Sequence, residues 1–160
     1  EQWLQHGGQS SIEAYKEVVS KEIKEHLNFY SKMVEFHVDN NNRLFVHAGF
    51  TNLRGPDQEY YSTSLFWDRT LWEMTLAMDK SLHRDSDRYP KRLQLFKEIY
   101  IGHTPVTRIG QNKPLNIANV WNIDTGAAFK GKISAIDVIS KEIWQSDPVH
   151  ELYPAEQGRN

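Results

Sequence analysis

Residues 44–49, LFVHAG, and residues 98–105, EIYIGHTP, are two short apolar runs that each stop at small residues and a histidine. Each run has the length of a buried strand, and the small residues permit a sharp turn at its end. The two runs therefore predict strands that deliver His47 and His103 at their carboxyl ends. In layered α/β proteins, ligands collect at that edge of a sheet.

The sequence before and between these runs predicts helices and a hairpin. Apolar residues at helical spacing predict one helix, or two short ones, over 11–32 and another helix over 63–80. The alternating run at 34–38 and the turn cluster that follows it predict that 34–47 is a β-hairpin.

The rest of the chain predicts short strands with loops between them. The expected elements are a helical turn at 91–95, strands at 119–124, 132–138 and 142–144, and loops at 51–62, 81–90 and 106–118. The fold class is therefore expected to be α/β. One domain is expected over 1–145, with a surface tail over 146–160.

Composition excludes several classes of protein. The chain has 160 residues with 19 Lys and Arg against 21 Asp and Glu, which gives a formal net charge of −2. No basic excess is available to neutralise the phosphates of a nucleic acid, and no apolar run has the length of a membrane span. Neither nucleic acid nor a membrane is therefore expected as a partner. The absence of cysteine excludes disulfides and thiolate metal sites, and it is compatible with a cytoplasmic protein.

The two strand-terminal histidines are the strongest candidates for chemistry. Neutral imidazole is the commonest metal ligand in proteins, and His47 and His103 could meet at one site. The alternative is that each histidine forms a hydrogen bond to nearby backbone at the end of its own strand.

Arg69 and Asp124 are two further candidates. Arg69 follows Phe66-Trp67-Asp68 early in an expected helix, where a guanidinium could clamp a phosphoryl group with two parallel hydrogen bonds. The alternative is a surface arginine paired with Asp68 or Glu73. Asp124 could belong to a metal site, but an aspartate before Thr-Gly more often caps its own turn, and that interpretation is preferred.

Taken together, these segments resemble the calcineurin-like metallophosphoesterases, most closely the bacterial Ser/Thr protein phosphatase and diadenosine-tetraphosphatase branch. The resemblance runs from about residue 3 to about residue 138, and the order and spacing of its motifs match. The motifs are FVHAG at 45–49, FWDR at 66–69, IGHTP at 101–105, and NIDTGA at 122–127 followed by GK at 131–132.

The resemblance implies a fold and a chemistry. The fold would be the C-terminal part of a layered αββα sandwich, with mixed sheets flanked by helices. His47 and His103 would be ligands of one metal in a two-metal site holding manganese, iron or zinc, and Arg69 would bind the phosphate of the substrate. A metal-bridging hydroxide would attack phosphorus, and the metals would stabilise the developing charge.

Three motifs of the resemblance are missing from this chain. They are the Asp-x-His, Gly-Asp-x-x-Asp-Arg-Gly and Gly-Asn-His motifs of the N-terminal half, which carry most of the metal ligands. The chain is therefore expected to be the C-terminal portion of a longer enzyme, to bind metal weakly or not at all on its own, and to hydrolyse little. Its open sheet edges are expected to require the missing N-terminal half or self-association.

The substrate remains open at this stage. A phosphorylated protein or small molecule is expected, with phosphomonoester hydrolysis as the first hypothesis. The alternatives are a dinucleoside polyphosphate hydrolase of the same fold and a truncated interaction module without catalysis. The loop at 51–63, which carries Asp57, Glu59, Tyr60 and Tyr61, is expected to contribute to substrate selection.

Overall fold

The computed structural model describes residues 3–4 and 8–154, and it shows a mixed α/β protein. The chain divides into two compact units, Glu1–Val34 and Glu35–Asn160. None of the helices in the described ranges has the length and hydropathy that crossing a bilayer requires.

The first unit is a pair of short helices, α1 (Gln9–Ala14) and α2 (Ser20–Tyr30). The helical pattern over 11–32 therefore corresponds to two helices, the second of the two expected arrangements. The helices contact each other through Tyr15 and His26, whose hydroxyl oxygen and Nδ1 lie 2.7 Å apart. No residue of either helix is buried, so side-chain contacts at the surface hold this pair.

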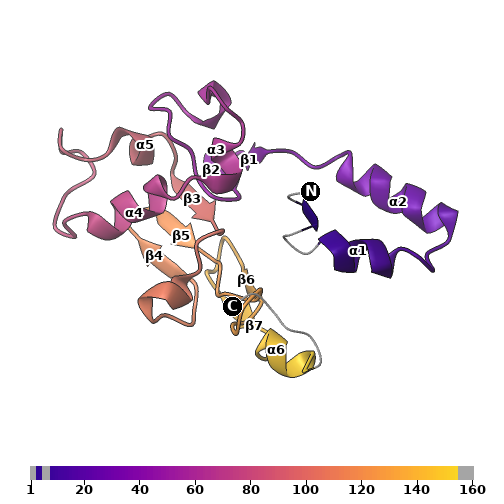
Figure 1. Cartoon of the computed structure of the whole chain (residues 1–160). Helices are drawn as coiled ribbons and strands as arrows, with labels where there is room; N and C mark the ends of the chain where they lie inside the picture. Colours follow the sequence, from indigo (N-terminus) through magenta and orange to yellow (C-terminus); the bar gives the residue numbers. More distant parts are fainter. Residues whose placement is uncertain (1–2, 5–7, 155–160) are drawn as a thin grey trace. The chain divides into compact units, whose positions relative to one another are not determined.

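The second unit is built on a five-stranded mixed sheet with the strand order β1-β2-β3-β5-β4 (Figure 1). The antiparallel β1–β2 pair confirms the hairpin predicted over 34–47. The three central strands β2, β3 and β5 are parallel, and β4 is antiparallel to β5. The strands are β1 (Phe36–Val38), β2 (Arg43–Val46), β3 (Glu98–Ile101), β4 (Leu115–Ile117) and β5 (Val120–Asn122).

The central strands are aligned so that their carboxyl ends share one edge of the sheet. Leu44 pairs with Ile99, and Ile99 pairs with Val120. All three side chains are completely buried. Because parallel strands in register finish together, the residues that follow β2, β3 and β5 are brought side by side.

A hydrophobic core covers one face of this sheet. Short helices α3 (Ser64–Trp67), α4 (Thr70–Ala77) and α5 (Lys91–Gln94) contribute to it, and its aliphatic and aromatic side chains alternate with outward-facing ones along the strands. The core consists of Leu44, Val46, Phe50, Leu65, Leu71, Trp72, Tyr89, Leu93, Phe96, Ile99, Ile101, Val106 and Val120.

The helix predicted over 63–80 is wrong as a single element, because Asp68 interrupts it. Asp68 has an extended backbone with ψ of 133°, and it separates α3 from α4. Its carboxylate accepts hydrogen bonds from the backbone N–H groups of Thr70 and Leu71 at 3.1 and 3.2 Å, which satisfies two donors in the first turn of α4. The helical spacing of apolar residues continues across this break, because α3 and α4 both contribute apolar side chains to the same hydrophobic core.

A row of aromatic rings covers part of the opposite face of the sheet. Strand register aligns His37 with Phe45, Phe45 with Tyr100, and Tyr100 with Trp121. The Phe45 and Tyr100 rings are stacked with centroids 5.0 Å apart, and the Lys141 ammonium lies 5.3 Å from the centroid of the Tyr100 ring. Lys141 belongs to the turn between β6 (Ser134–Ile136) and β7 (Ile143–Gln145), which form a separate two-stranded sheet.

Several elements were not expected from the sequence, among them the single-turn helices η2 (Pro56–Gln58) and η3 (Val106–Ile109) in segments predicted as loops. Strand β4 lies in the segment predicted as a loop over 106–118, and a two-residue turn at Ala118 and Asn119 joins it to β5. Ala118 has a φ of +53°, a left-handed conformation that tight hairpin turns require but that is uncommon for alanine. In the segment predicted as a tail, the short helix α6 (Val149–Leu152) is held by the Val149 N–H, which donates to the Gly131 carbonyl at 2.9 Å.

Candidate metal and phosphate site

The candidate site lies at the carboxyl edge of the three parallel strands. His47 directly follows β2, His103 follows β3 after one glycine, and Asp124 follows β5 after one residue. Backbone hydrogen bonds keep the strand ends together: the Gly102 N–H donates to the His47 carbonyl at 2.8 Å. The prediction that two strands deliver His47 and His103 at their carboxyl ends is thus confirmed.

The rings of His47 and His103 are neighbours and meet edge-on. Their centroids are 5.2 Å apart, with the planes inclined at 61°. The His47 side chain is open to solvent, whereas His103 is half-buried. The Nε2 atom of His103 is buried and has no hydrogen-bond partner among the described residues. A buried polar atom without a partner is costly, so this nitrogen is available to a ligand.

The backbone of His103 is also unusual. Its φ is +63°, in the left-handed region that residues with a side chain rarely adopt. The tight turn from Gly102 to Pro105 requires this conformation, and it directs the chain from the strand end into the short helix η3 (Val106–Ile109). Strained residues of this kind cluster at functional sites.

The surroundings of His103 favour its neutral form. Burial lowers the pKa of His103 most, and the positive charges of His47, Arg69 and Arg108 lower it further, whereas the Asp124 carboxylate raises it. Neutral imidazole is the form that ligates metals, so this environment matches the role expected from the sequence.

Trp67 is a neighbour of the site that sequence reasoning did not single out. Its indole lies edge-on to the His103 ring with centroids 5.3 Å apart, although the side chain is 63% exposed. The available signal was its position in the same four-residue motif as Arg69. An exposed tryptophan two residues before a candidate phosphate ligand is better explained by the site than by the core.

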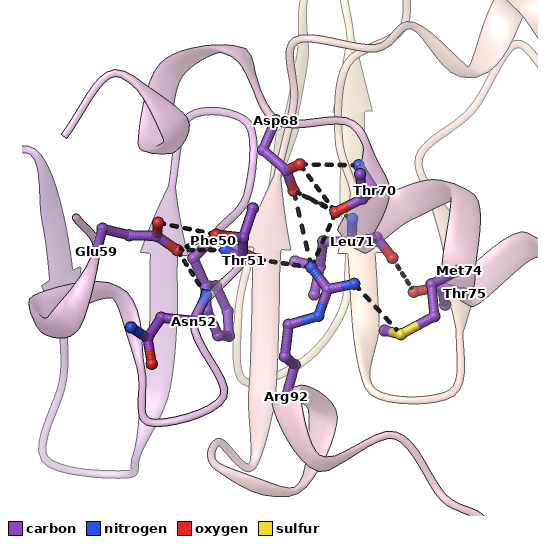
Figure 2. Close-up of polar contacts among 10 residues, drawn as sticks. All are labelled: Phe50, Thr51, Asn52, Glu59, Asp68, Thr70, Leu71, Met74, Thr75 and Arg92. Atoms are coloured by element: carbon purple, nitrogen blue, oxygen red, sulfur yellow. Dashed lines mark hydrogen bonds and ion pairs between the residues drawn. The ribbon is translucent and has the colours of Figure 1, made fainter. Parts of the chain in front are cut away.

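Arg69 is free of the salt bridges that a purely structural role would require. It is exposed at the N-cap of α4, and its guanidinium has no hydrogen bond or ion pair with any residue in the described ranges. Asp68, its expected alternative partner, is instead paired with Arg92 (Figure 2). The other expected partner, Glu73, meets Arg69 only through a backbone hydrogen bond of the helix.

Arg92 holds the segments around the site in place. Its Nη1 donates to the Phe50 carbonyl at 2.7 Å and to the Thr70 hydroxyl at 3.0 Å, and it lies 3.9 Å from an Asp68 oxygen (Figure 2). The Arg92 side chain is 12% exposed and that of Asp68 is 6% exposed. Burial lowers the pKa of Arg92, while the charges of Asp68 and Glu59 raise it.

The loop at 51–63 is organised by Glu59. Its carboxylate accepts hydrogen bonds from the backbone N–H of Thr51 and from that of Asn52, the latter at 2.8 Å (Figure 2). Glu59 is therefore engaged inside the loop. Tyr60 and Tyr61 are 86% and 66% exposed, and Asp57 is exposed as well, so the role of this loop in substrate selection stays a prediction.

Asp124 caps its own turn, as preferred from the sequence. Its Oδ1 accepts a hydrogen bond from the Gly126 N–H at 2.9 Å. Gly126 has a φ of +78°, and a Cβ at Gly131 would lie 1.8 Å from the Thr125 carbonyl oxygen. Both glycines are therefore required by the backbone of this turn, which flanks the two histidines.

The residues present fit part of a metal site. The partnerless Nε2 of His103 and the exposed ring of His47 could supply two nitrogen ligands. No three His, Asp or Glu side chains within the described parts of the chain converge on one point. Because protein metal sites have three or four protein ligands, the described residues supply about half of one.

The second unit also has a hollow away from the two histidines. Its volume is about 920 Å³, and its walls include Leu76, Arg84, Tyr89 and Asn116. None of His47, His103 or Arg69 lines it. The hollow has a partnerless amide oxygen, Asn119 Oδ1, in its wall, whereas the two-histidine edge combines a partnerless imidazole nitrogen with an arginine that has no ion pair among the described residues. An imidazole and a guanidinium suit a metal and a phosphate, so we assign the candidate chemistry to the edge.

Comparisons with known proteins give relatives but no family model, since none matches the chain. Bis(5'-nucleosyl)-tetraphosphatase PrpE (asymmetrical) of Bacillus cereus strain Q1 is 29% identical over 151 residues, covering 88% of this chain and 56% of that protein. The protein of the same name from Bacillus thuringiensis strain Al Hakam is 30% identical over 142 residues, covering 82% and 52%. The chain thus spans about half the length of the curated relatives it matches.

Proposed function

We propose that this chain contributes part of the active site of a metal-dependent phosphoesterase. The observation that carries the proposal is the pair of adjacent histidines, one with a buried Nε2 that lacks a partner among the described residues, together with an arginine that has no ion pair among them. The relatives named as tetraphosphatases support hydrolysis of a phosphorus–oxygen bond.

The roles follow from the chemistry of each side chain. His47 and His103 would hold a divalent metal, with manganese, iron or zinc as the expected ions and a second metal in the complete site. A bound metal would supply a Lewis acid that neutralises charge on the phosphoryl group and lowers the pKa of water. Arg69 would bind two phosphate oxygens through its planar guanidinium, which fixes the phosphoryl group beside the histidines. Trp67 would hold the His103 ring in place from the side.

The substrate class that we propose is the dinucleoside polyphosphate. From the sequence, this was the alternative to a phosphomonoester such as a phosphoprotein, and the names of the relatives favour it. Each substrate presents a phosphoryl group to the same histidine and arginine side chains, so the two hypotheses differ in what lies beyond that group.

The remaining metal ligands would come from residues that the described ranges do not contain. We propose that the five-stranded sheet forms one layer of an αββα sandwich, and that a preceding half of the enzyme or a second copy completes both the sandwich and the site. Aspartate carboxylates are the expected ligands, because two neutral imidazoles leave the charge of two dications uncompensated. A cytoplasmic location is part of the same proposal.

The test compares three substrates on the natural full-length protein. Diadenosine tetraphosphate, an aryl phosphate and a phosphoserine peptide are supplied with manganese and, separately, with EDTA. We expect manganese-dependent turnover that is fastest with diadenosine tetraphosphate. Preference for the peptide would restore the protein phosphatase hypothesis, and turnover of none of the three would overturn the proposed function.

A further inference from the structure

The segment that follows His103 forms a second wall of the candidate site. The Val106 N–H, at the start of η3, donates to the Asp124 carbonyl at 2.9 Å. Helix η3 is thereby tied to the residue that follows β5, at the same edge of the sheet as the two histidines. Gly110, with a φ of +75°, ends η3 and turns the chain away.

Close packing fixes the position of η3 against the Asp124 turn. A Cβ at Gly126 would lie 2.9 Å from the Thr107 Oγ1 and 3.7 Å from the Pro105 Cβ. The Phe129 N–H donates to the Gly126 carbonyl at 2.9 Å, which places Phe129 on the other side of the same turn. Only glycine at 126 allows η3 to approach this closely.

Between η3 and this turn lies a small hollow of about 200 Å³. Its walls are Pro105, Thr107, Arg108 and Phe129. Two of the lining groups are apolar, Thr107 adds a hydroxyl, and Arg108 adds a positive charge. The Arg108 side chain is exposed and makes no ion pair with any residue that the structure describes.

Arg108 belongs to η3, which begins three residues after His103 and is tied to Asp124 at the same edge of the sheet as the histidine pair. Arg69, at the N-cap of α4, comes two residues after Trp67, whose indole contacts the His103 ring, and both Arg69 and Arg108 are exposed. Two arginines from different elements thus raise the positive potential at one edge. A single phosphoryl group held by the histidines and Arg69 does not account for the second arginine.

We propose that the hollow at Arg108 and Phe129 is a second anion subsite, which binds a neighbouring phosphate of a polyphosphate substrate. This proposal rests on the proposed function and deepens it, because it names what selects a phosphate chain over a single phosphate. The Arg108 guanidinium binds the second phosphate through paired N–H donors, and the Thr107 hydroxyl is available as a third donor. The Phe129 ring offers an apolar surface to the group beyond that phosphate.

The test is a substitution series at Arg108 in the natural full-length protein with manganese. Arg108→Gln removes the charge, Arg108→Lys keeps it but loses the planar fork, and Arg88→Gln is the matched control on an exposed arginine. The readout is the ratio of kcat/KM for diadenosine tetraphosphate to kcat/KM for an aryl phosphate. We expect Arg108→Gln to lower this ratio about tenfold, through KM, because it removes charge-assisted hydrogen bonds that solvent partly screens at an exposed side chain. Arg108→Lys should recover part of the loss.

A binding measurement separates this proposal from the proposed function. Inorganic tripolyphosphate and orthophosphate are titrated by calorimetry into the wild type and Arg108→Gln, and only the tripolyphosphate affinity should fall. An unchanged kcat/KM ratio together with equal tripolyphosphate affinity would overturn the subsite. If the wild type hydrolyses none of the substrates but still loses tripolyphosphate affinity on Arg108→Gln, the proposed function fails and the anion subsite stands.

Discussion

Arg92, from α5, and Arg69, at the N-cap of α4, both lie near the first turn of α4, yet their surroundings are opposite. The Arg92 guanidinium is nearly buried, with hydrogen bonds to Phe50 and Thr70 and an ion pair with Asp68. Arg69 is exposed and has no such partner among the described residues. The comparison teaches that Arg92 holds loops of this unit in place through satisfied hydrogen bonds, whereas Arg69, within the described ranges, leaves its donors free beside the partnerless Nε2 of His103 at the carboxyl edge of β2, β3 and β5.

The largest expected effect is at the histidine edge. In the natural full-length protein, His103→Asn should lower manganese-dependent turnover about 10³-fold, because it removes a metal ligand. Asparagine tolerates a positive φ, so this variant should keep the turn. Metal content by atomic absorption and steady-state kinetics measure the effect, and His83→Asn, at an exposed histidine, is the control. Unchanged metal content and turnover would contradict the role of His103.

The next effect concerns stability alone. Arg92→Met should lower the free energy of unfolding by about 2–3 kcal/mol, because it leaves the buried Asp68 carboxylate without its counter-charge. Asp68 keeps its hydrogen bonds to Thr70 and Leu71, which limits the loss. Chemical denaturation with Arg88→Met as the control measures it. A loss equal to that of the control would show that Arg92 contributes no more to the free energy of unfolding than an exposed arginine does.

Arg69→Ala should show the reverse pattern. The free energy of unfolding should change by less than about 0.5 kcal/mol, since the guanidinium has no partner to lose. Turnover by the full-length protein should fall about 10²-fold, as expected when one preorganised contact to a phosphoryl group is removed. A stability loss like that of Arg92→Met would remove the distinction between the two arginines.

The smallest expected effect is at the other face of the sheet, where Glu98, Tyr100 and Lys141 form an ion-pair cluster. Lys141 Nζ lies 2.6 Å from the Glu98 carboxylate. Burial raises the pKa of Glu98, but the hydrogen bonds from Lys141 and Tyr100 outweigh it, and the net pKa lies below the ordinary value of 4.5. The stabilisation is therefore complete above that pH and disappears as the pH falls through the folded-state pKa.

Glu98→Gln should thus cost about 1 kcal/mol at pH 7 and almost nothing near pH 2. The pKa of Lys141 is raised, because its bonds to Glu98 and Tyr100 outweigh burial, so the same stabilisation is lost at high pH as Lys141 deprotonates. Denaturation curves across this pH range, with the exposed Glu142→Gln as the control, measure the effect. A difference that stays constant from pH 7 to pH 2 would show that the pair contributes nothing through its charge.

The sequence predicted the elements that carry His47 and His103 because both strands are short, apolar and ended by small residues. It predicted the hairpin at 34–47 because the run at 34–38 alternates apolar and polar residues and a turn cluster follows it. It could not order the strands, since parallel pairing between β2, β3 and β5 depends on contacts far apart in the chain. The sequence pattern also carried no sign that Asp68 would cap α4, because apolar spacing continues through the break.

In the candidate site, the residue types indicated the chemistry, although the arrangement of the side chains could not be predicted. Histidine and arginine indicated a metal and a phosphate before any distance was known. Trp67 was missed because its exposure cannot be read from a helical pattern, and Arg108 was missed because its segment lacks periodicity. Strand β4 was missed for a similar reason, since its turn uses alanine at a positive φ, where glycine or asparagine is the usual signal.

The edge-to-face contact between Trp67 and His103 has an optical consequence. Indole fluorescence is sensitive to groups within a few ångströms of the ring, and Trp67 lies 5.3 Å from His103, centroid to centroid. A paramagnetic manganese ion held by the two histidines would quench this tryptophan, while the core tryptophan Trp72 would report on folding instead. Because the chain has five tryptophans, the part of the emission that Trp67→Phe removes would report on occupancy of the site, separately from the integrity of the fold.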